Sequence, residues 1–286
     1  MNLKNINLLV TEHCTLACAG CSTGAPFAKK ISHSAESFCK WLDILQNKEI
    51  PFTSIALTGG EPFLHPEVRD GGFIQLLKTR YPSKWVQLTT NFSWASEERV
   101  IGYAPVVGML DGLGISIYES VVQKLGGLDE FHRLTMLLKD MCPNTKVTLY
   151  DKRHFVAWEF HEAKREVKGP CITSDCFILK PDGKLSHCSL AIGAQNIPAY
   201  NVILEKSQEA LFDLSKLNEK EELLSWQQKY PFDLCFNCTM WEHIRVPWYS
   251  LRPQSEAEML EGKLRLLLAR AAALRDLHAI EASQRS

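Results

Sequence analysis

The chain has 286 residues, enough for one large domain or two smaller ones. Lys and Arg total 32 against 33 for Asp and Glu, and a formal net charge of −1 gives no electrostatic reason to expect nucleic acid or an anionic membrane as a partner. A hydrophobic content of 45% argues against disorder. No apolar run approaches the roughly 20 residues that span a bilayer, and the first residues lack a secretory pattern. We therefore expect a folded cytoplasmic protein.

The first half of the sequence alternates short apolar runs with amphipathic stretches. Such alternation indicates consecutive βα units, whose parallel strands form a sheet. An open doubly wound sheet and a partial barrel both fit this pattern, and both place ligands at the carboxyl ends of their strands. Strands are predicted at residues 6–11, 54–58, 85–90, 113–118 and 146–150. Helices are predicted after Ser34 and at residues 73–80, 96–103 and 119–141.

The alternation ends near Val167, and a different pattern follows. The sequence FILKPDGKLSHC at 177–188 predicts a β-hairpin, because Pro-Asp-Gly favours a tight turn between its two apolar flanks. A helix is predicted at 219–229, and a longer packing helix from Ser255 onward. The chain is therefore expected to divide into an α/β domain, a small cysteine-rich domain and a C-terminal helical extension, with bounds at 1–166, 167–243 and 244–286.

Ten cysteines are the most informative feature of the composition. In a reducing compartment, clustered cysteines serve metal binding or catalysis more often than disulfides. Eight of the ten fall in two groups with short internal spacings, and two stand alone. The first group is Cys14, Cys18 and Cys21; the second is Cys171, Cys176, Cys188, Cys235 and Cys238; the isolated pair is Cys39 and Cys142. The sequence therefore favours two metal sites.

The first group forms the run CTLACAGC, which directly follows the first predicted strand. Three thiolates on one short loop can bind three corners of a 4Fe–4S cluster and leave the fourth iron open for a ligand. A zinc site is the alternative, in which His13 would supply the fourth ligand of a tetrahedral ion. The spacing alone leaves both open.

The second predicted strand runs directly into Gly59-Gly60-Glu61-Pro62. Glycines at a strand end allow the backbone to approach a ligand closely, because no Cβ intervenes. The glycine carbonyls and the Glu61 carboxylate are acceptors for a cationic amine. An ordinary strand-to-loop turn would explain this motif by itself, but its combination with the three-cysteine loop favours a ligand site.

Together, CTLACAGC at 14–21, TGGEP at 58–62, TTN at 89–91 and GISIY at 114–118 resemble the radical SAM enzyme superfamily. The resemblance implies a partial (β/α)6 barrel over 1–166. It also implies a 4Fe–4S cluster on the first three cysteines, with S-adenosylmethionine bound to the open iron. The cofactor-binding residues that the resemblance implies are Gly59, Gly60 and Glu61 beside the methionyl amine, and Asn91, Ser116 and Tyr118 near the carboxylate or ribose.

The chemistry implied by this resemblance proceeds by single electrons. An electron donor such as flavodoxin or ferredoxin reduces the cluster, which then cleaves S-adenosylmethionine. The resulting 5′-deoxyadenosyl radical abstracts a hydrogen atom from the substrate. The cofactor carries the bond chemistry, and the protein supplies placement and exclusion of water.

The second cysteine group fits a zinc ribbon and an iron–sulfur site equally well by spacing alone. Its resemblance to the auxiliary-cluster domain called Twitch or SPASM implies a second 4Fe–4S cluster within 167–243. Cys188, Cys235 and Cys238 are the firmer ligands, and either Cys171 or Cys176 is the remaining one. Cys39 and Cys142 are expected to be packing residues, and either is also a candidate donor of a hydrogen atom to a substrate radical.

We therefore expect a radical SAM enzyme of the oxidoreductase or epimerase type. Its expected substrate is a small polar molecule such as a sugar or an aminocyclitol, because an auxiliary cluster suits net oxidation and few residues precede the first strand. Modification of a ribosomally made peptide is one alternative. A zinc-stabilised interaction scaffold is the alternative outside enzymology. Neither nucleic acid nor a membrane is expected as a partner.

Overall fold

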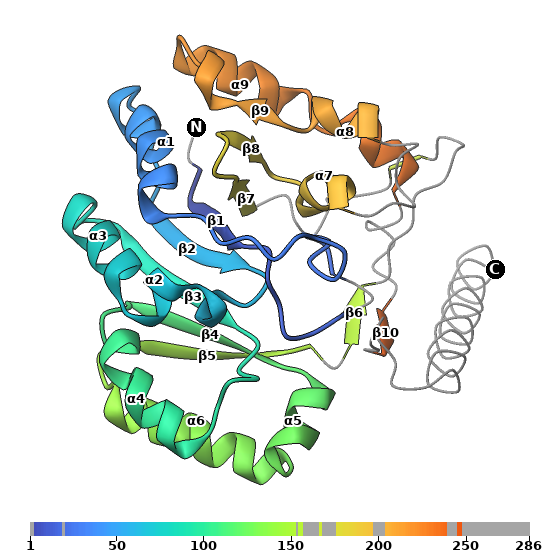
Figure 1. The fold of residues 1–286 in the computed structure, drawn as a ribbon. Coiled ribbons are helices and arrows are strands. Elements are labelled where there is room, and N and C mark those ends of the chain that lie inside the picture. Colours follow the sequence, from blue (N-terminus) through green and yellow to red (C-terminus); the bar gives the residue numbers. More distant parts are fainter. Residues whose placement is uncertain are drawn as a thin grey trace, which may run out of the picture.

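A computed structural model describes residues 3–18, 21–152, 154–156, 166–167, 176–196, 204–238 and 245–247. An eight-stranded mixed sheet dominates the fold, with strand order β5-β4-β3-β2-β1-β7-β8-β9 (Figure 1). Its strands are β1 (Asn5–Thr11), β2 (Ser54–Gly59), β3 (Trp85–Thr90), β4 (Gly112–Ile117), β5 (Lys146–Asp151), β7 (Cys176–Leu179), β8 (Lys184–Ser186) and β9 (Phe212–Asp213). A separate antiparallel pair joins β6 (His154–Val156) to β10 (Arg245–Pro247).

The five strands predicted in the first half are all present, and their ends differ from the prediction by at most one residue. They pair in parallel, which confirms the α/β class. Apolar runs such as Leu8-Leu9-Val10 form central strands because helices or loops bury both faces of a parallel sheet, and all three side chains are fully or almost fully buried.

Strands β1 to β5 lie side by side in the order of the sequence. Right-handed crossovers between strands in this order place the connecting helices on one face of the sheet, where Figure 1 shows α1, α3 and α4. A doubly wound sheet would instead reverse its strand order. The helices of this half are α1 (Ala35–Asn47), α2 (Pro66–Arg69), α3 (Gly72–Arg80), α4 (Glu97–Val107), α5 (Glu119–Leu125) and α6 (Leu128–Met141). In the described residues β5 and β9 are the sheet edges, so the partial barrel stays a prediction.

The single helix predicted at 119–141 is wrong, because the chain forms α5 and α6 there. Gly126 and Gly127 separate the two helices, with φ of 99° and 119°. These values lie in the left-handed region, which ends a right-handed helix and which glycine adopts at little cost. The flanking sequences keep a helical apolar pattern, so the break depends on the glycines alone.

The hairpin predicted at 177–188 is present as β7 and β8. Strand β7 also pairs in parallel with β1, with Asn5 opposite Cys176 and Leu8 opposite Leu179. The hairpin therefore extends the main sheet across the boundary expected near residue 166. The division into three domains stays a prediction, and most of 244–286 lies outside the described residues.

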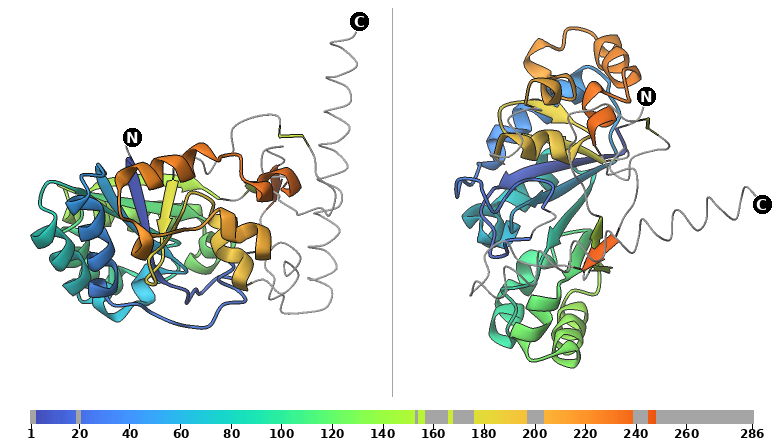
Figure 2. Two further views of the ribbon diagram at one scale, coloured as in Figure 1. Left: turned by 90° about the horizontal axis from the view of Figure 1, so that it is seen from above. Right: turned by 90° about the vertical axis from the view of Figure 1, so that its right-hand side faces the viewer.

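Helices after the hairpin lie over β8 and β9, at the end of the molecule opposite α4 and α6 (Figures 1 and 2). The ring of His187 packs there among the rings of Phe177, Trp226, Tyr230 and Phe232. The helices are α7 (Ser189–Gly193), α8 (Leu204–Glu209) and α9 (Lys220–Gln228); the 3-10 helices are η1 (Pro62–Leu64), η2 (Ala194–Asn196), η4 (Leu214–Lys216) and η5 (Asp233–Asn237).

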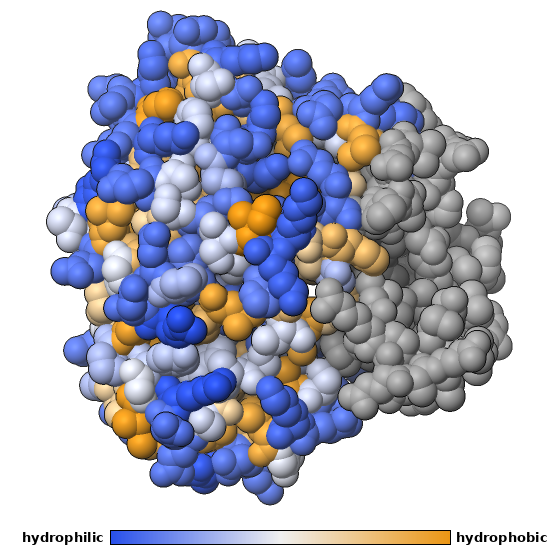
Figure 3. Space-filling view, viewed as in Figure 1, coloured by the Kyte–Doolittle hydropathy of each residue, from blue (hydrophilic) through white to orange (hydrophobic). Residues whose placement is uncertain are grey.

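The surface of the described part is mixed in character. On the face shown in Figure 3, apolar residues are scattered among polar ones rather than gathered in one patch. Scattered apolar residues are the normal state of a protein surface. Among the described helices, none combines the length and apolarity needed to cross a lipid bilayer.

The turn of the hairpin docks on α1. The indole Nε1 of Trp41 donates a hydrogen bond to the carbonyl oxygen of Pro181 at 2.9 Å. Gly183 has φ of 86°, and a Cβ there would lie 2.7 Å from the Trp41 ring. We expect Gly183→Ala to lower the free energy of unfolding by about 2 kcal/mol, because it combines left-handed strain with a steric clash.

Urea denaturation measures this loss against a matched glycine in α4. A Cβ at Gly102 would meet nothing within 4 Å, so Gly102→Ala is expected to keep or raise the stability. Equal stability of Gly183→Ala and the unchanged protein would show that the hairpin turn does not dock on Trp41.

Candidate active site

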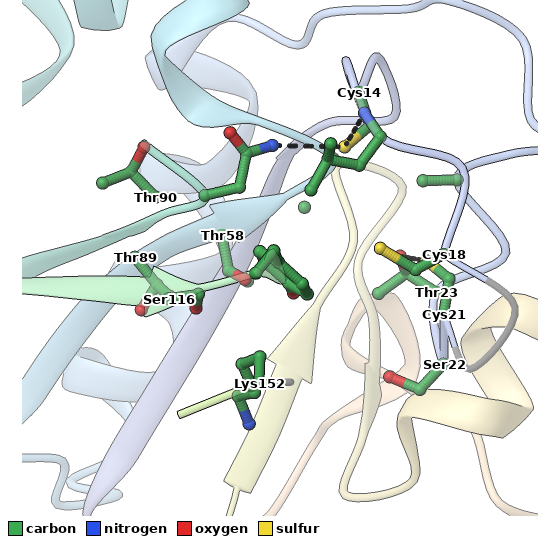
Figure 4. A pocket seen from close by; sticks show the side chains of 16 residues that line it. Cys14, Cys18, Cys21, Ser22, Thr23, Thr58, Thr89, Thr90, Ser116 and Lys152 are labelled. Atoms are coloured by element: carbon green, nitrogen blue, oxygen red, sulfur yellow. Dashed lines mark hydrogen bonds between the residues drawn. The ribbon is translucent and has the colours of Figure 1, made fainter. Parts of the chain in front are cut away.

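A cavity of about 330 Å³ lies at the carboxyl ends of β1 to β5 (Figure 4). Every one of these five strands, or the segment directly after it, contributes to the lining, as parallel α/β architecture predicts. The residues that come from strand ends are Thr58, Gly59 and Gly60 from β2, Thr89, Thr90 and Asn91 from β3, Ser116 and Tyr118 from β4, and Lys152 after β5. The loop after β1 closes the cavity.

All three cysteines of the first group line this cavity. The backbone N–H of Cys21 donates to the carbonyl oxygen of Cys18 at 3.2 Å. The Cys14 sulfur accepts hydrogen bonds from the backbone N–H of Leu16 at 3.4 Å and from the Asn91 side chain at 3.6 Å. Burial raises the pKa of the Cys14 thiol to about 12, and the Leu16 amide opposes this rise.

Three thiols line one cavity, which matches the donor type and number that a 4Fe–4S cluster with one open iron requires. Within the described residues, no group of three or more His, Cys, Asp or Glu side chains meets the geometry of a metal-ion site, so the fit is one of donor chemistry. His13 does not line the cavity.

The two glycines of the second motif lie against the segment that leads into the cysteine loop. Gly60 N–H donates to the carbonyl oxygen of Thr11, and Glu61 N–H donates to that of His13, both at 2.7 Å. A Cβ on Gly59 would lie 2.2 Å from the Thr11 oxygen, and one on Gly60 would lie 2.1 Å from the His13 oxygen. Both glycines line the cavity, but what requires glycine here is contact with the protein backbone.

Glu61 is almost fully buried and does not itself line the cavity. Its carboxylate accepts three hydrogen bonds, from the Thr90 hydroxyl at 2.8 Å, the Asn91 N–H at 2.7 Å and the Phe63 N–H at 3.2 Å. Burial raises the pKa of Glu61 to about 7, and these three donors oppose that rise. The contact of Glu61 with a methionyl amine stays a prediction.

The hydrogen bonds to Glu61 therefore connect the TTN motif at 89–91 to the TGGEP motif at 58–62. The Thr90 hydroxyl accepts from the Phe92 N–H at 3.0 Å and from the Trp94 indole at 2.9 Å, so its own proton points to Glu61. The Asn91 side chain donates to the Thr15 hydroxyl at 3.1 Å as well as to the Cys14 sulfur. Asn91 therefore connects Glu61 to Cys14: its backbone N–H binds the Glu61 carboxylate, and its side-chain amide binds the Cys14 sulfur.

Ser116 and Tyr118 reach the cavity from the end of β4 and the residue after it. Burial, followed by the three cysteine sulfurs, raises the pKa of Tyr118 well above its ordinary value, so its hydroxyl keeps its proton. The structure thus brings five of the six predicted cofactor-binding residues to the cavity wall. Their contacts with a cofactor stay predictions.

Lys152 was not singled out from the sequence, although it lines the cavity (Figure 4). Among the described residues that line the cavity, it is the one cationic side chain. Ser22, Thr23, Thr58 and Thr89 were missed as well. Lys152 could have been found from the sequence, because ligands bind at the carboxyl ends of parallel strands and the strand predicted at 146–150 ends two residues before it.

The second cysteine group is described in part. Cys171 lies outside the described residues, and Cys176 is the first residue of β7. The Cys188 sulfur caps α7 by accepting from the Ala191 N–H at 3.4 Å. The Cys238 N–H donates to the carbonyl oxygen of Cys235 at 3.2 Å. Helix α8 contacts both α7 and η5, the elements that carry these cysteines. A shared metal site stays a prediction.

The two isolated cysteines belong to the hydrophobic core. Cys39 is fully buried, and Cys142 is 2% exposed. The Cys142 thiol donates to the carbonyl oxygen of Ala104 at 3.3 Å. Neither residue lines the cavity, so their geometry agrees with the packing role.

Comparisons with known proteins give only remote likenesses. No family model matches the sequence, and no curated protein matches it. A crystal structure of BtrN with AdoMet and 2-DOIA is 13% identical, with a TM-score of 0.49, over 82% of this chain and 92% of that one. Native anSMEcpe with AdoMet is 12% identical, with a TM-score of 0.44, over 65% of this chain and 74% of that one. A histidine-tagged form of anSMEcpe with AdoMet is 14% identical, with a TM-score of 0.45, over 96% of this chain and 99% of that one. Likeness this weak carries no argument about activity.

Glu61→Gln tests the buried carboxyl through the pH dependence of stability. The folded protein keeps the Glu61 proton up to about pH 7, whereas the unfolded chain releases it near 4.5. The stabilisation from this shift is therefore complete below pH 4.5 and is lost as pH rises through 7. We expect the unchanged protein to lose up to about 3 kcal/mol relative to Glu61→Gln between about pH 5 and pH 8.

Urea titrations of metal-free, reduced protein measure this difference. Groups common to both proteins cancel, and the amide that meets the Asn91 N–H adds an offset that does not depend on pH. Equal pH slopes for the two proteins would show that folded Glu61 is ionised throughout this range.

Proposed function

We propose that the protein is a radical SAM enzyme that abstracts a hydrogen atom from a small polar substrate, such as a sugar or an aminocyclitol, in an oxidation or an epimerisation. One observation carries this proposal: the three closely spaced cysteines line a single cavity at the strand ends, together with the glycines of the second motif and with Asn91. A zinc scaffold has no need of such a cavity.

Cys14, Cys18 and Cys21 would hold a 4Fe–4S cluster in this cavity. When bound, that cluster and S-adenosylmethionine supply the 5′-deoxyadenosyl radical that removes a hydrogen atom from the substrate. Burial favours the thiol form of Cys14, and the hydrogen bonds from Leu16 and Asn91 oppose this by stabilising the thiolate, which is the form that binds iron. Radical chemistry requires protection from solvent, which the loop after β1 and the strand ends around the cavity would provide.

The lining of the cavity supports a polar ligand. Seven of its residues carry a hydroxyl group: Ser22, Thr23, Thr58, Thr89, Thr90, Ser116 and Tyr118. Asn91 adds an amide, and Lys152 adds a positive charge. Hydroxyl and ammonium groups favour a ligand with several oxygen acceptors and at least one negative charge. The carboxylate of S-adenosylmethionine and a hydroxylated substrate both have this chemistry.

The second cysteine group would hold an auxiliary 4Fe–4S cluster in a Twitch-like domain, on Cys188, Cys235, Cys238 and one of Cys171 and Cys176. In both C-x2-C pairs, Cys18–Cys21 and Cys235–Cys238, the N–H of the second cysteine donates to the carbonyl oxygen of the first, and this common feature supports a shared type of ligand. Such a cluster would accept the electron left on an oxidised substrate. A flavodoxin or a ferredoxin is the electron donor that we expect.

Iron content tests the cluster assignment. Protein purified without oxygen is expected to hold about eight irons, from two 4Fe–4S clusters. Replacing Cys14, Cys18 and Cys21 together by Ala is expected to lower this to about four, whereas Cys39→Ala in the core leaves it unchanged. Stoichiometric zinc instead of iron would support the scaffold alternative, and full iron in the triple variant would contradict the first-loop assignment.

Product analysis tests the reaction. Reduced protein with S-adenosylmethionine is expected to form 5′-deoxyadenosine, and the triple variant none. With a deuterated substrate the label is expected in 5′-deoxyadenosine, and a panel of labelled sugars, aminocyclitols and peptides identifies the substrate class. Transfer from a peptide alone would overturn the small-molecule assignment, and no 5′-deoxyadenosine under full reduction would overturn the enzyme assignment.

A further inference from the structure

Residues 189–196, which form α7 and η2, lie against the loop that carries the first cysteines (Figure 1). The contact is between backbones. A Cβ on Gly193 would lie 2.2 Å from the carbonyl oxygen of Ser22 and 2.9 Å from the carbonyl carbon of Thr23. Real Cβ atoms do not approach a backbone this closely, so any larger residue at 193 would displace one of the two segments.

Asn196 ties the same segment to both ends of the loop. Its side-chain N–H group donates to the carbonyl oxygen of Thr23 at 3.3 Å, although the two residues are 173 positions apart. Glu12, before the first cysteine of the loop, is a second hydrogen-bond partner of the Asn196 side chain. Glu12 precedes Cys14 and Thr23 follows Cys21, so one amide spans the whole cysteine run.

The loop residues that Gly193 and Asn196 contact, Ser22 and Thr23, belong to the candidate active site. Ser22 and Thr23 line the cavity, and the Thr23 hydroxyl is 3.4 Å from the Cys21 sulfur. The N–H of Gly24 donates to the carbonyl oxygen of Cys21 at 3.2 Å, so residues 21 to 24 form one hydrogen-bonded turn. A shift of Ser22 therefore changes where the Cys21 thiol points.

We propose that residues 189–196 act as a brace that positions the first cysteine loop, with Gly193 and Asn196 as its positioning residues. The relevance of the brace to a cluster rests on the proposed function. Because the sulfur of Cys188 caps α7, one short helix also links a cysteine of the second group to Ser22 and Thr23, which follow Cys21 of the first.

Alkylation of Cys21 in metal-free, reduced protein tests the brace without any cofactor. A pulse of iodoacetamide followed by peptide mass spectrometry gives the rate at each cysteine. Gly193→Ala is expected to raise the Cys21 rate at least about threefold, because local loosening exposes the thiol. Gly102→Ala is expected to leave it unchanged, since that Cβ meets nothing within 4 Å.

Cys39, which is fully buried in the core, reports whether the fold is intact. An unchanged Cys21 rate in Gly193→Ala would overturn the proposal. If Gly193→Ala also exposes Cys39, the milder Asn196→Ala decides, because it removes only hydrogen bonds. A faster Cys21 reaction with Cys39 still protected would support the brace, and an unchanged Cys21 rate would overturn it.

The helix cap gives an independent pair of variants. Cys188→Ser keeps an acceptor for the Ala191 N–H, whereas Cys188→Ala removes it. In the metal-free protein, only Cys188→Ala is expected to speed Cys21 alkylation. Equal Cys21 alkylation rates in the two variants would show that the hydrogen bond at the start of α7 does not affect the first cysteine loop.

Metal-loaded protein links the brace to the cluster. After anaerobic reconstitution, Gly193→Ala is expected to lose the change that S-adenosylmethionine causes in the electron paramagnetic resonance spectrum of the reduced cluster, and Gly102→Ala to keep it. The same change in both variants would contradict the role of the brace at the cluster. Absence of iron from the unchanged protein would overturn the proposed function, and the alkylation rates would still decide whether the brace exists.

Discussion

One buried carboxylate organises the strand ends around the cavity. Glu61 follows β2, and its oxygens accept from the side chain of Thr90 and the backbone of Asn91 at the end of β3. Each of these hydrogen bonds contributes about 0.5–1.5 kcal/mol when the Glu61 carboxyl is protonated and about 1.5–3 kcal/mol when it is ionised, so they stabilise this junction in both states. The same junction leads into the turn at Phe92, whose backbone φ of 61° lies in the left-handed region. With that backbone fixed, the Asn91 amide reaches the Cys14 sulfur.

Glycine contacts fix the cysteine loop from two directions. Gly60 lies against the backbone of His13 at one end of the loop, and Gly193 lies against that of Ser22 at the other. Both contacts depend on the absence of a side chain, which is why no bulky or polar residue marks them in the sequence. The loop is thus held by steric fit with distant segments, as well as by its own hydrogen bonds.

Local pattern predicted the strands and the gathering of the motifs, because continuous apolar runs form buried parallel strands and the carboxyl ends of such strands meet. It missed what depends on contacts between distant residues. The bonds from Thr90 and Asn91 to Glu61 require β2 and β3 to be neighbours, and the contact of Gly193 with Ser22 leaves no trace in either segment. The break at Gly126-Gly127 was missed because helical periodicity continues on both sides of it.

The pairing of β7 with β1 has a consequence for how the chain folds as it is made. The Asn7 side chain donates to the carbonyl oxygen of Phe177, across 170 positions of sequence. Until the ribosome has delivered residues 176–179, the first strand offers a bare row of N–H and C=O groups on one side. Exposed strand edges recruit other chains. The nascent half-protein therefore exposes the unpaired edge of its amino-terminal strand, and this aggregation hazard ends when the hairpin arrives.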